Sequence, residues 1–375
     1  MEGLYRLTET ALLLMSFWGY FFVVSRFGKI KSWFVPVVCM AGISLVLFFG
    51  GLLGVLALAA DVAFFGGLAG FIVFAVLLFR RKIRPLKWSL LGFCFGAGAV
   101  VFLLLSLDLK LLHYDNFSHW ALIVKYLLST DYFPGADTVM ISFRDYPPGS
   151  SVFIYYVCRF AGRSQGIMLL AQNSMVIACF YAVFGIVKER RRFLLYSFLG
   201  MGCALLSYPN LTIRINNLLV DFLLPLLAMA SAAVSFRYCT EKWKLCILQV
   251  ILLGFMGIVK NTGLFFAGAA GIYALWRNFY AGRENRKTES GKGGAGKTGS
   301  LGKRAKILVC GALMLCGAAL PSLAWQRHLD VDLAGFEGKF EMGKTAVEYG
   351  APVGEGFYGQ VTRDFLETSF DLSGR

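Results

Sequence analysis

The chain has 375 residues, of which 57% are hydrophobic and only 16% are charged. A soluble domain usually carries about a quarter charged residues, so this composition predicts a membrane protein. The formal net charge of +15 argues for nucleic acid only if the basic residues form one patch. They lie instead in short clusters between apolar runs, as the positive-inside rule describes, so we expect no nucleic-acid partner.

Apolar runs of roughly 20 residues, the length that crosses a bilayer as a helix, recur along the chain. They predict an all-α polytopic membrane protein with about ten transmembrane helices and juxtamembrane amphipathic helices in a large outer loop. The expected spans are 7–24, 33–59, 62–79, 88–107, 165–187, 193–208, 218–236, 245–259, 262–280 and 307–325.

Basic clusters between these spans predict which loops face the cytoplasm. The clusters are Arg26/Lys29/Lys31, Arg80–Lys87, Lys188–Arg192, Arg237–Lys244 and the loop 281–306. The segments 60–61, 108–164, 209–217, 260–261 and 326–375 then face outward. We expect an integral protein of a bacterial plasma membrane with its active site on the outer face.

The outer loop 108–164 contains two candidate helices. Phe117, Trp120, Val124 and Leu127 recur at helical spacing and predict an amphipathic helix that lies on the membrane surface. Residues 150–162 are apolar but too few to span a membrane. If they did form a span, the next basic cluster, Lys188–Arg192, would lie on the outer face. This segment is therefore expected to be a juxtamembrane or re-entrant helix.

The loop 281–306 includes Gly291–Thr298, which matches the phosphate-loop pattern. That motif binds a nucleotide only between a strand and a helix, and polar residues precede it here. We therefore expect a flexible, basic, Gly-rich cytoplasmic linker and no nucleotide at 291–298. After the last span, 326–375 forms an outer loop, and its ending without another span leaves open that the chain is part of a longer protein.

Two scarce carboxylates are the leading catalytic candidates. Asp115 precedes the helical stripe of the outer loop, and the alternative for it is a helix N-cap. Asp221 lies a few residues inside an expected span, where a charge is costly unless it is paired or hydrated. The alternative for Asp221 is an acid that reaches to the interface or pairs with Arg214.

Basic residues near the outer edge suit the phosphate of a lipid, or else anchor the chain at the interface. Arg144, Arg214 and Lys260 are the candidates, and Asn261 lies beside Lys260. His113 and His119 flank Asp115, so a metal site is conceivable, although two histidines and one acid identify no particular ion.

The stretch Asp115-Asn116-Phe117-Ser118-His119-Trp120 resembles the acidic motif that opens the first outer loop of GT-C glycosyltransferases. Tyr146-Pro147-Pro148-Gly149 is similar to the Lys-Pro-Pro-Leu element that closes this loop, and Asp221 lies where the family keeps a second outer acid. Two positions depart from the pattern: Asn116 replaces a second acid, and Tyr146 replaces a phosphate-binding lysine.

The resemblance implies transfer of a sugar, with inversion, from a polyprenyl-phosphate donor to a glycan, lipid or protein acceptor. Asp115 would be the general base, Asp221 would orient the acceptor or stabilise the oxocarbenium-like charge, and a divalent cation is possible. Substrate contacts would come from His119, Arg144, Tyr146, Arg214, Lys260 and Asn261. The expected divisions are a three-helix segment 1–87, a GT-C-like core 88–236, C-terminal membrane helices 237–325 and the outer loop 326–375.

Two other functions remain open at this point. A polysaccharide polymerase or ligase also has a large basic outer loop, but its site would not depend on Asp115. A transporter or flippase would favour inverted repeats and broken helices at the midplane, and the sequence shows no internal repeat.

Overall fold

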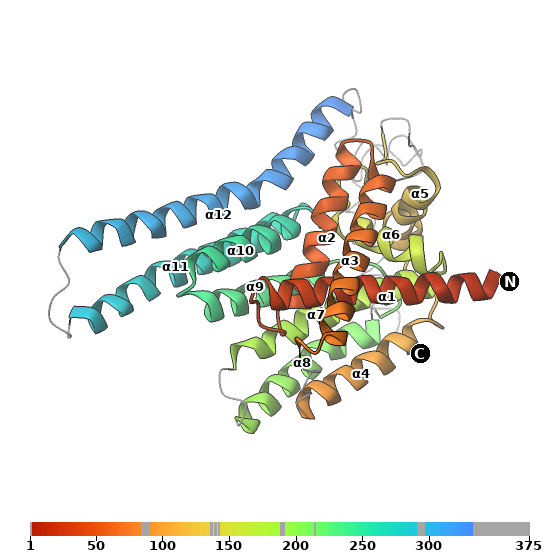
Figure 1. Ribbon diagram of the computed structural model, residues 1–375. Helices are drawn as coiled ribbons and strands as arrows, with labels where there is room; N and C mark the ends of the chain where they lie inside the picture. Colours follow the sequence, from red (N-terminus) through yellow and green to blue (C-terminus); the bar gives the residue numbers. More distant parts are fainter. Residues whose placement is uncertain are drawn as a thin grey trace, which may run out of the picture.

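A computed structural model describes residues 2–83, 90–135, 138, 141, 143–187, 192–213, 215–290 and 297–332. The described chain is helical, and it contains no strand. In chain order the elements are α1 (Glu2–Arg26), α2 (Val35–Leu52), α3 (Leu56–Phe79), α4 (Leu90–Ser106), the π-helical turn η1 (Asn116–Trp120), α5 (Ala121–Thr130), α6 (Gly149–Ala161), α7 (Gln165–Val183), the 3-10 turn η2 (Phe184–Ile186), α8 (Phe193–Ile213), α9 (Leu223–Tyr238), α10 (Lys242–Gly257), α11 (Gly263–Ser290) and α12 (Lys297–Asp332). Figure 1 shows α10, α11 and α12 running together away from the rest of the molecule.

Among the described residues, five helices are long and apolar enough to cross a membrane. They are Thr8–Arg26, Val35–Leu52, Leu56–Phe79, Gln165–Ile186 and Leu308–Asp332. Three shorter apolar helices cover Gly92–Ser106, Phe193–Tyr208 and Leu223–Tyr238. The all-α membrane class is thus supported, whereas the expected number of about ten spans is not confirmed.

The first hairpin turns earlier than the hydropathy pattern predicted. Gly54 adopts a left-handed backbone (φ +72°) between α2 and α3, so the turn lies at residues 53–55. The expected outer segment 60–61 is therefore inside α3. Asp61 thus lies in α3, where its carboxylate forms an ion pair with Arg159 of α6. The Arg159 Nε and Asp61 Oδ1 atoms are 3.2 Å apart.

The amphipathic stripe of the outer loop packs against protein along α5, while Phe117 at its start is exposed. Val124 and Leu127 of α5 are fully buried, and α5 packs against α6. Helix α6 has only 13 residues, which agrees with the expected non-spanning segment, and nearly every one of its side chains is buried. The amphipathic helix predicted here is therefore present, and α6 covers part of its apolar stripe.

The expected flexible linker 281–306 is largely helical. Helix α11 continues to Ser290 and α12 begins at Lys297, so only 291–296, which includes most of the phosphate-loop pattern, lies outside the described residues. Helix α12 also extends to Asp332, seven residues into the expected outer loop; the remainder of that loop, 333–375, is not described.

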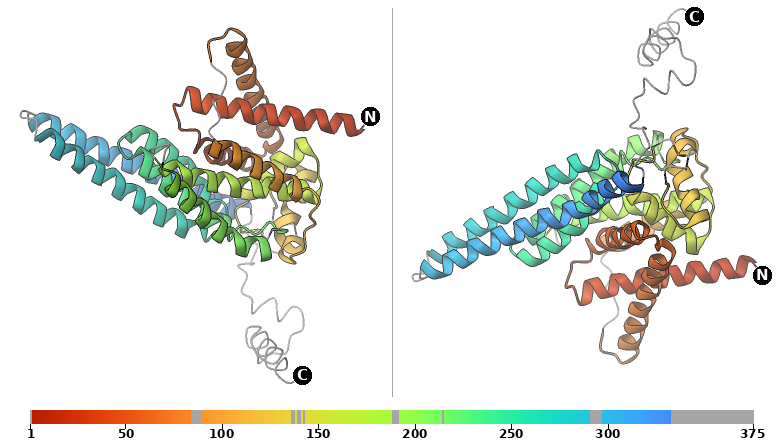
Figure 2. Two further views of the ribbon diagram at one scale, coloured as in Figure 1. Left: turned by 90° about the horizontal axis from the view of Figure 1, so that it is seen from below. Right: turned by 90° about the horizontal axis from the view of Figure 1, so that it is seen from above.

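Close helix contacts hold the N-terminal part of the bundle together. Tyr20 of α1 donates a hydrogen bond to the carbonyl of Ala63 at 2.6 Å, and Ser16 donates to that of Phe64 at 2.9 Å. A Cβ at Gly19 would lie 1.9 Å from the carbonyl oxygen of Gly67, so only glycine permits this approach of α1 and α3. The two further views in Figure 2 show α1 and α3 crossing beside the longer C-terminal helices.

Segments that were expected on the inner face contact one another, and so do segments that were expected on the outer face. At the basic end, the Lys31 amide donates to the Tyr238 hydroxyl at 2.7 Å, and Lys244 donates to the Lys29 carbonyl at 3.3 Å. At the other end, the Gly149 amide donates to the Ile258 carbonyl at 2.7 Å. Segments that were expected on the same side of the membrane are therefore in contact at these two places, and the orientation of the helices in the membrane stays a prediction.

Candidate functional site

Asn116 joins the start of the outer loop to the segment before α9. Its side-chain oxygen accepts a hydrogen bond from the Leu218 amide at 2.9 Å, and its amide group donates to the His113 carbonyl at 3.0 Å. Asn116 is fully buried. A carboxylate cannot both donate and accept in this way, so the asparagine found where the GT-C pattern has a second acid fits a docking role.

The Asp115 carboxylate does not cap a helix. Its backbone is already helical (φ −60°, ψ −21°), and its side chain makes no cap hydrogen bond to η1, so the N-cap alternative is wrong. One carboxylate oxygen lies 3.6 Å from Nδ1 of His113. The negative charge of Asp115 is also the main cause of a raised pKa at Tyr114. The carboxylate is about a quarter exposed and is thus accessible to a ligand.

Asp221 precedes α9 instead of lying inside a span. Helix α9 begins at Leu223, and the side chain of Asp221 is 40% exposed. The Asp221 carboxylate pairs with Lys260, whose Nζ lies 2.9 Å away. The alternative partner, Arg214, lies outside the described residues.

Lys260 stands at the centre of the site. It lies in the turn between α10 and α11, and its Nζ is 5.9 Å from the ring centroids of both Trp120 and Tyr146. Cation–π attraction adds to the ion pair with Asp221 in holding the ammonium there. Lys260 and Tyr146 are 114 positions apart in the chain, and the fold brings their side chains together.

The Tyr146 phenol is within electrostatic reach of three carboxylates. Burial is the largest cause of its raised pKa; Lys260 opposes this effect, while Asp145, Asp221 and Asp115 add to it. Charges from the outer loop, the α8–α9 connection and the α10–α11 turn therefore all act on the Tyr146 hydroxyl, and Lys260 lies 5.9 Å from the centroid of its ring. In Figure 1 this region is at the end of the molecule where α5 and α6 lie beside the last turns of α12.

Asp145 is a third carboxylate near this site, and sequence reasoning did not select it. Burial raises its pKa, and a side-chain hydrogen bond with Asn261 opposes this shift. Its carbonyl accepts a hydrogen bond from Nε1 of Trp325, at 2.9 Å. The only signal in the sequence is its place in Arg144-Asp145-Tyr146-Pro147-Pro148-Gly149, and Asn261 was expected to bind substrate, not a neighbouring acid.

His119 and Arg144 lie behind the site surface. His119 is 2% exposed and Arg144 is 8% exposed. The His119 ring meets those of Trp120, Phe143 and Tyr146 edge to face. Burial, and then the charge of Lys260, lower the pKa of His119 to about 4, so the imidazole is neutral at pH 7. The buried His119 is therefore suited to support Tyr146, not to touch a substrate.

Within the part of the chain that the structure describes, no three His, Cys, Asp or Glu side chains are grouped so that they could hold a metal ion. In comparisons with other proteins, no family model matches this chain. Neither a curated protein nor a solved structure matches it.

Proposed function

We propose that this protein is a membrane glycosyltransferase that moves a sugar from a polyprenyl-phosphate donor to an acceptor on the outer face. The proposal combines the resemblance to GT-C enzymes with one observation of the structure. That observation is the ion pair of Lys260 with Asp221, at 2.9 Å, whose ammonium lies 5.9 Å from the ring centroids of Trp120 and Tyr146, both from the loop that contains Asp115.

In the proposed reaction, an acceptor hydroxyl attacks the anomeric carbon while the bond from that carbon to the phosphate oxygen breaks. Asp115 takes the proton of the hydroxyl, because its carboxylate is accessible and is not used as a helix cap. The polyprenyl phosphate leaves with the bonding electrons, and the sugar is inverted by this single displacement.

Lys260 binds the phosphate as it departs. In the ligand-free site its ammonium is held by Asp221 and by two aromatic rings, so its position is defined before a donor arrives. Asp221 thus acts through Lys260 as well as on the reacting sugar. His119 and Asn116 position the groups that touch substrate, since both are buried.

The test is an assay of sugar release from a polyprenyl-phosphate donor by the purified protein in proteoliposomes. Asp115→Asn is expected to lower turnover by about 10²–10⁴-fold, as loss of a general base does. Asp221→Asn should also lower turnover. Asp108→Asn is the matched control, because Asp108 is an exposed acid at the start of the same loop.

Two results would decide against the proposal. Unchanged turnover in both Asp115→Asn and Asp221→Asn would refute the mechanism and would favour a polymerase or ligase site that does not need Asp115. Release of no sugar by the wild-type protein from any polyprenyl-phosphate donor, in liposomes that preserve its fold, would refute the function itself.

A further inference from the structure

The end of the outer loop and the turn between α10 and α11 are joined by two hydrogen bonds. The Gly149 amide donates to the Ile258 carbonyl at 2.7 Å. Four positions before Gly149, the carboxylate of Asp145 accepts a hydrogen bond from the side chain of Asn261. One bond is formed by backbone groups and the other by side chains. Together they hold the loop against the turn.

Tyr146 and Lys260 lie next to the second of these bonds. Tyr146 directly follows Asp145, and Lys260 directly precedes Asn261. The Lys260 Nζ is 5.9 Å from the centroid of the Tyr146 ring, and the Lys260 side chain is only 19% exposed. Within the turn, the Gly263 amide donates to the Lys260 carbonyl at 2.7 Å. Because this bond closes the turn, a shift of Asn261 moves the backbone of Lys260 with it.

Asp145 is itself fixed from α12. Nε1 of Trp325 donates to the Asp145 carbonyl at 2.9 Å, and Trp325 is 2% exposed. The Trp325 ring packs between Phe48 of α2 and Phe133 of the outer loop, with both ring centroids 6.0 Å away. The backbone of Asp145 is thus bonded to a buried aromatic cluster. A side chain on a backbone held in this way can impose a position on its partner.

A lysine needs such support, because its ammonium is a point charge on a flexible stem. Asp221 pairs with the ammonium of Lys260, whereas Asp145 acts on the backbone next to it. We infer that Asp145 is a positioning residue, which sets the place of the Lys260 ammonium through Asn261. The inference rests on the proposed function for what Lys260 binds. The position of Lys260 is a property of the protein without substrate, and it can be measured separately.

Competitive acetylation of the purified protein with a trace of acetic anhydride tests this inference. Labelling of Lys260 is measured by peptide mass spectrometry relative to Lys125, an exposed lysine of α5. Asp145→Ala and Asn261→Ala should each raise it about tenfold, the factor that corresponds to one hydrogen bond to a charged group. The double variant should not exceed either single one, because both remove the same bond.

Asp145→Asn separates positioning from charge. Asparagine keeps an oxygen that can accept from Asn261 but removes the carboxylate charge, so Lys260 should be labelled as in wild type. If the charge of Asp145 acted on Lys260 directly, Asp145→Asn would instead behave like Asp145→Ala.

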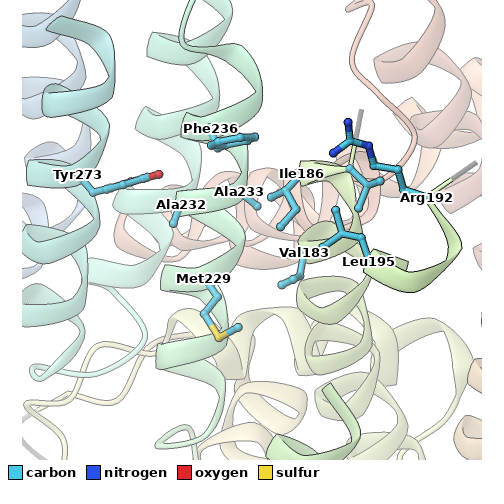
Figure 3. Close-up of a pocket in the computed structure, with 10 residues that line it drawn as sticks. Val183, Ile186, Arg192, Leu195, Met229, Ala232, Ala233, Phe236 and Tyr273 are labelled. Atoms are coloured by element: carbon cyan, nitrogen blue, oxygen red, sulfur yellow. The ribbon is translucent and has the colours of Figure 1, made fainter. Parts of the chain in front are cut away.

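Tyr273→Phe is the matched control. It removes a polar group from α11, the helix that follows Asn261, about 15 Å along the helix from Gly263. Figure 3 shows Tyr273 at a hollow of about 500 Å³, across from side chains of α9 such as Met229 and Phe236. None of the described lining residues of this hollow belongs to the loop 145–149 or to the turn 258–262. Labelling of Lys260 should therefore be the same in Tyr273→Phe as in wild type.

Three results would overturn the inference. They are unchanged labelling of Lys260 in Asn261→Ala, labelling in Asp145→Asn as fast as in Asp145→Ala, and an equal increase in Tyr273→Phe. If Asp145→Ala does not fold, as shown by gel filtration, Asn261→Ala decides, because Asn261 is exposed. Sugar release is measured on the same samples. Its absence in wild type would refute the proposed function, whereas the labelling result would stand.

Discussion

Burial of His119 should make the stability of the protein depend on pH. The pKa of His119 falls from 6.5 to about 4 on folding, because the ring is buried and Lys260 is near. Between these two pKa values the unfolded state binds a proton that the folded state does not bind, so stability rises with pH across this window. A gap of about 2.5 between the pKa values corresponds to about 3 kcal/mol, present above pH 6.5 and lost as the pH falls towards 4.

The free energy of unfolding can be measured by SDS titration of the purified protein in mixed micelles at several pH values from 4.5 to 7.5. His119→Phe keeps an aromatic ring among Trp120, Phe143 and Tyr146 but removes the titrating group, so its stability should vary less with pH than that of wild type. His113→Gln is the matched control, since His113 is in the same stretch but its side chain is 36% exposed. A pH dependence that is as steep in His119→Phe as in wild type would refute the reasoning.

Three further substitutions test contacts that position the site. Asn116→Ala should cost about 1–3 kcal/mol of stability and should lower turnover, because the Leu218 amide loses its acceptor in a buried place; equal stability in thermal unfolding would contradict this. Gly149→Ala should destabilise by about 1–3 kcal/mol, since the new Cβ would lie 2.5 Å from the Ile258 carbonyl oxygen; a normal melting temperature would show that the backbone can shift. Arg159→Met should cost only about 1–2 kcal/mol of stability, because its two carboxylate partners are about 40% exposed and solvent screens them. A loss above about 4 kcal/mol in denaturant titration would show that these ion pairs behave as buried ones.

Much of the candidate site could be predicted because its residues are rare in this chain. A carboxylate or an ammonium beside an apolar run stands out, and the side of the membrane follows from the basic clusters. Asp115, Asp221 and Lys260 were selected in this way, whereas Tyr146 was selected through the resemblance; in the structure Lys260 pairs with Asp221 and lies 5.9 Å from the ring centroid of Tyr146. Asp145 was missed because nothing about a single acid in a loop shows that it will be buried against Asn261.

The errors in the fold also have a common origin. Hydropathy measures the tendency of a segment to avoid water. An apolar segment avoids water equally well in lipid and in the interior of the protein, so hydropathy does not distinguish the two. The stripe of α5 was therefore assigned to lipid although it packs on α6. Composition similarly suggested a linker at 281–306, whereas much of it extends α11 and α12.

The sequence by itself indicated a helical protein with several apolar helices suited to a membrane, because hydropathy depends only on residues that are neighbours in the chain. Only the tertiary structure decided that Lys260 pairs with Asp221, that His119 is neutral, and that the Asp115 carboxylate is not a cap. Each of these depends on local backbone geometry, or on contacts between residues far apart in the chain, which no local pattern encodes.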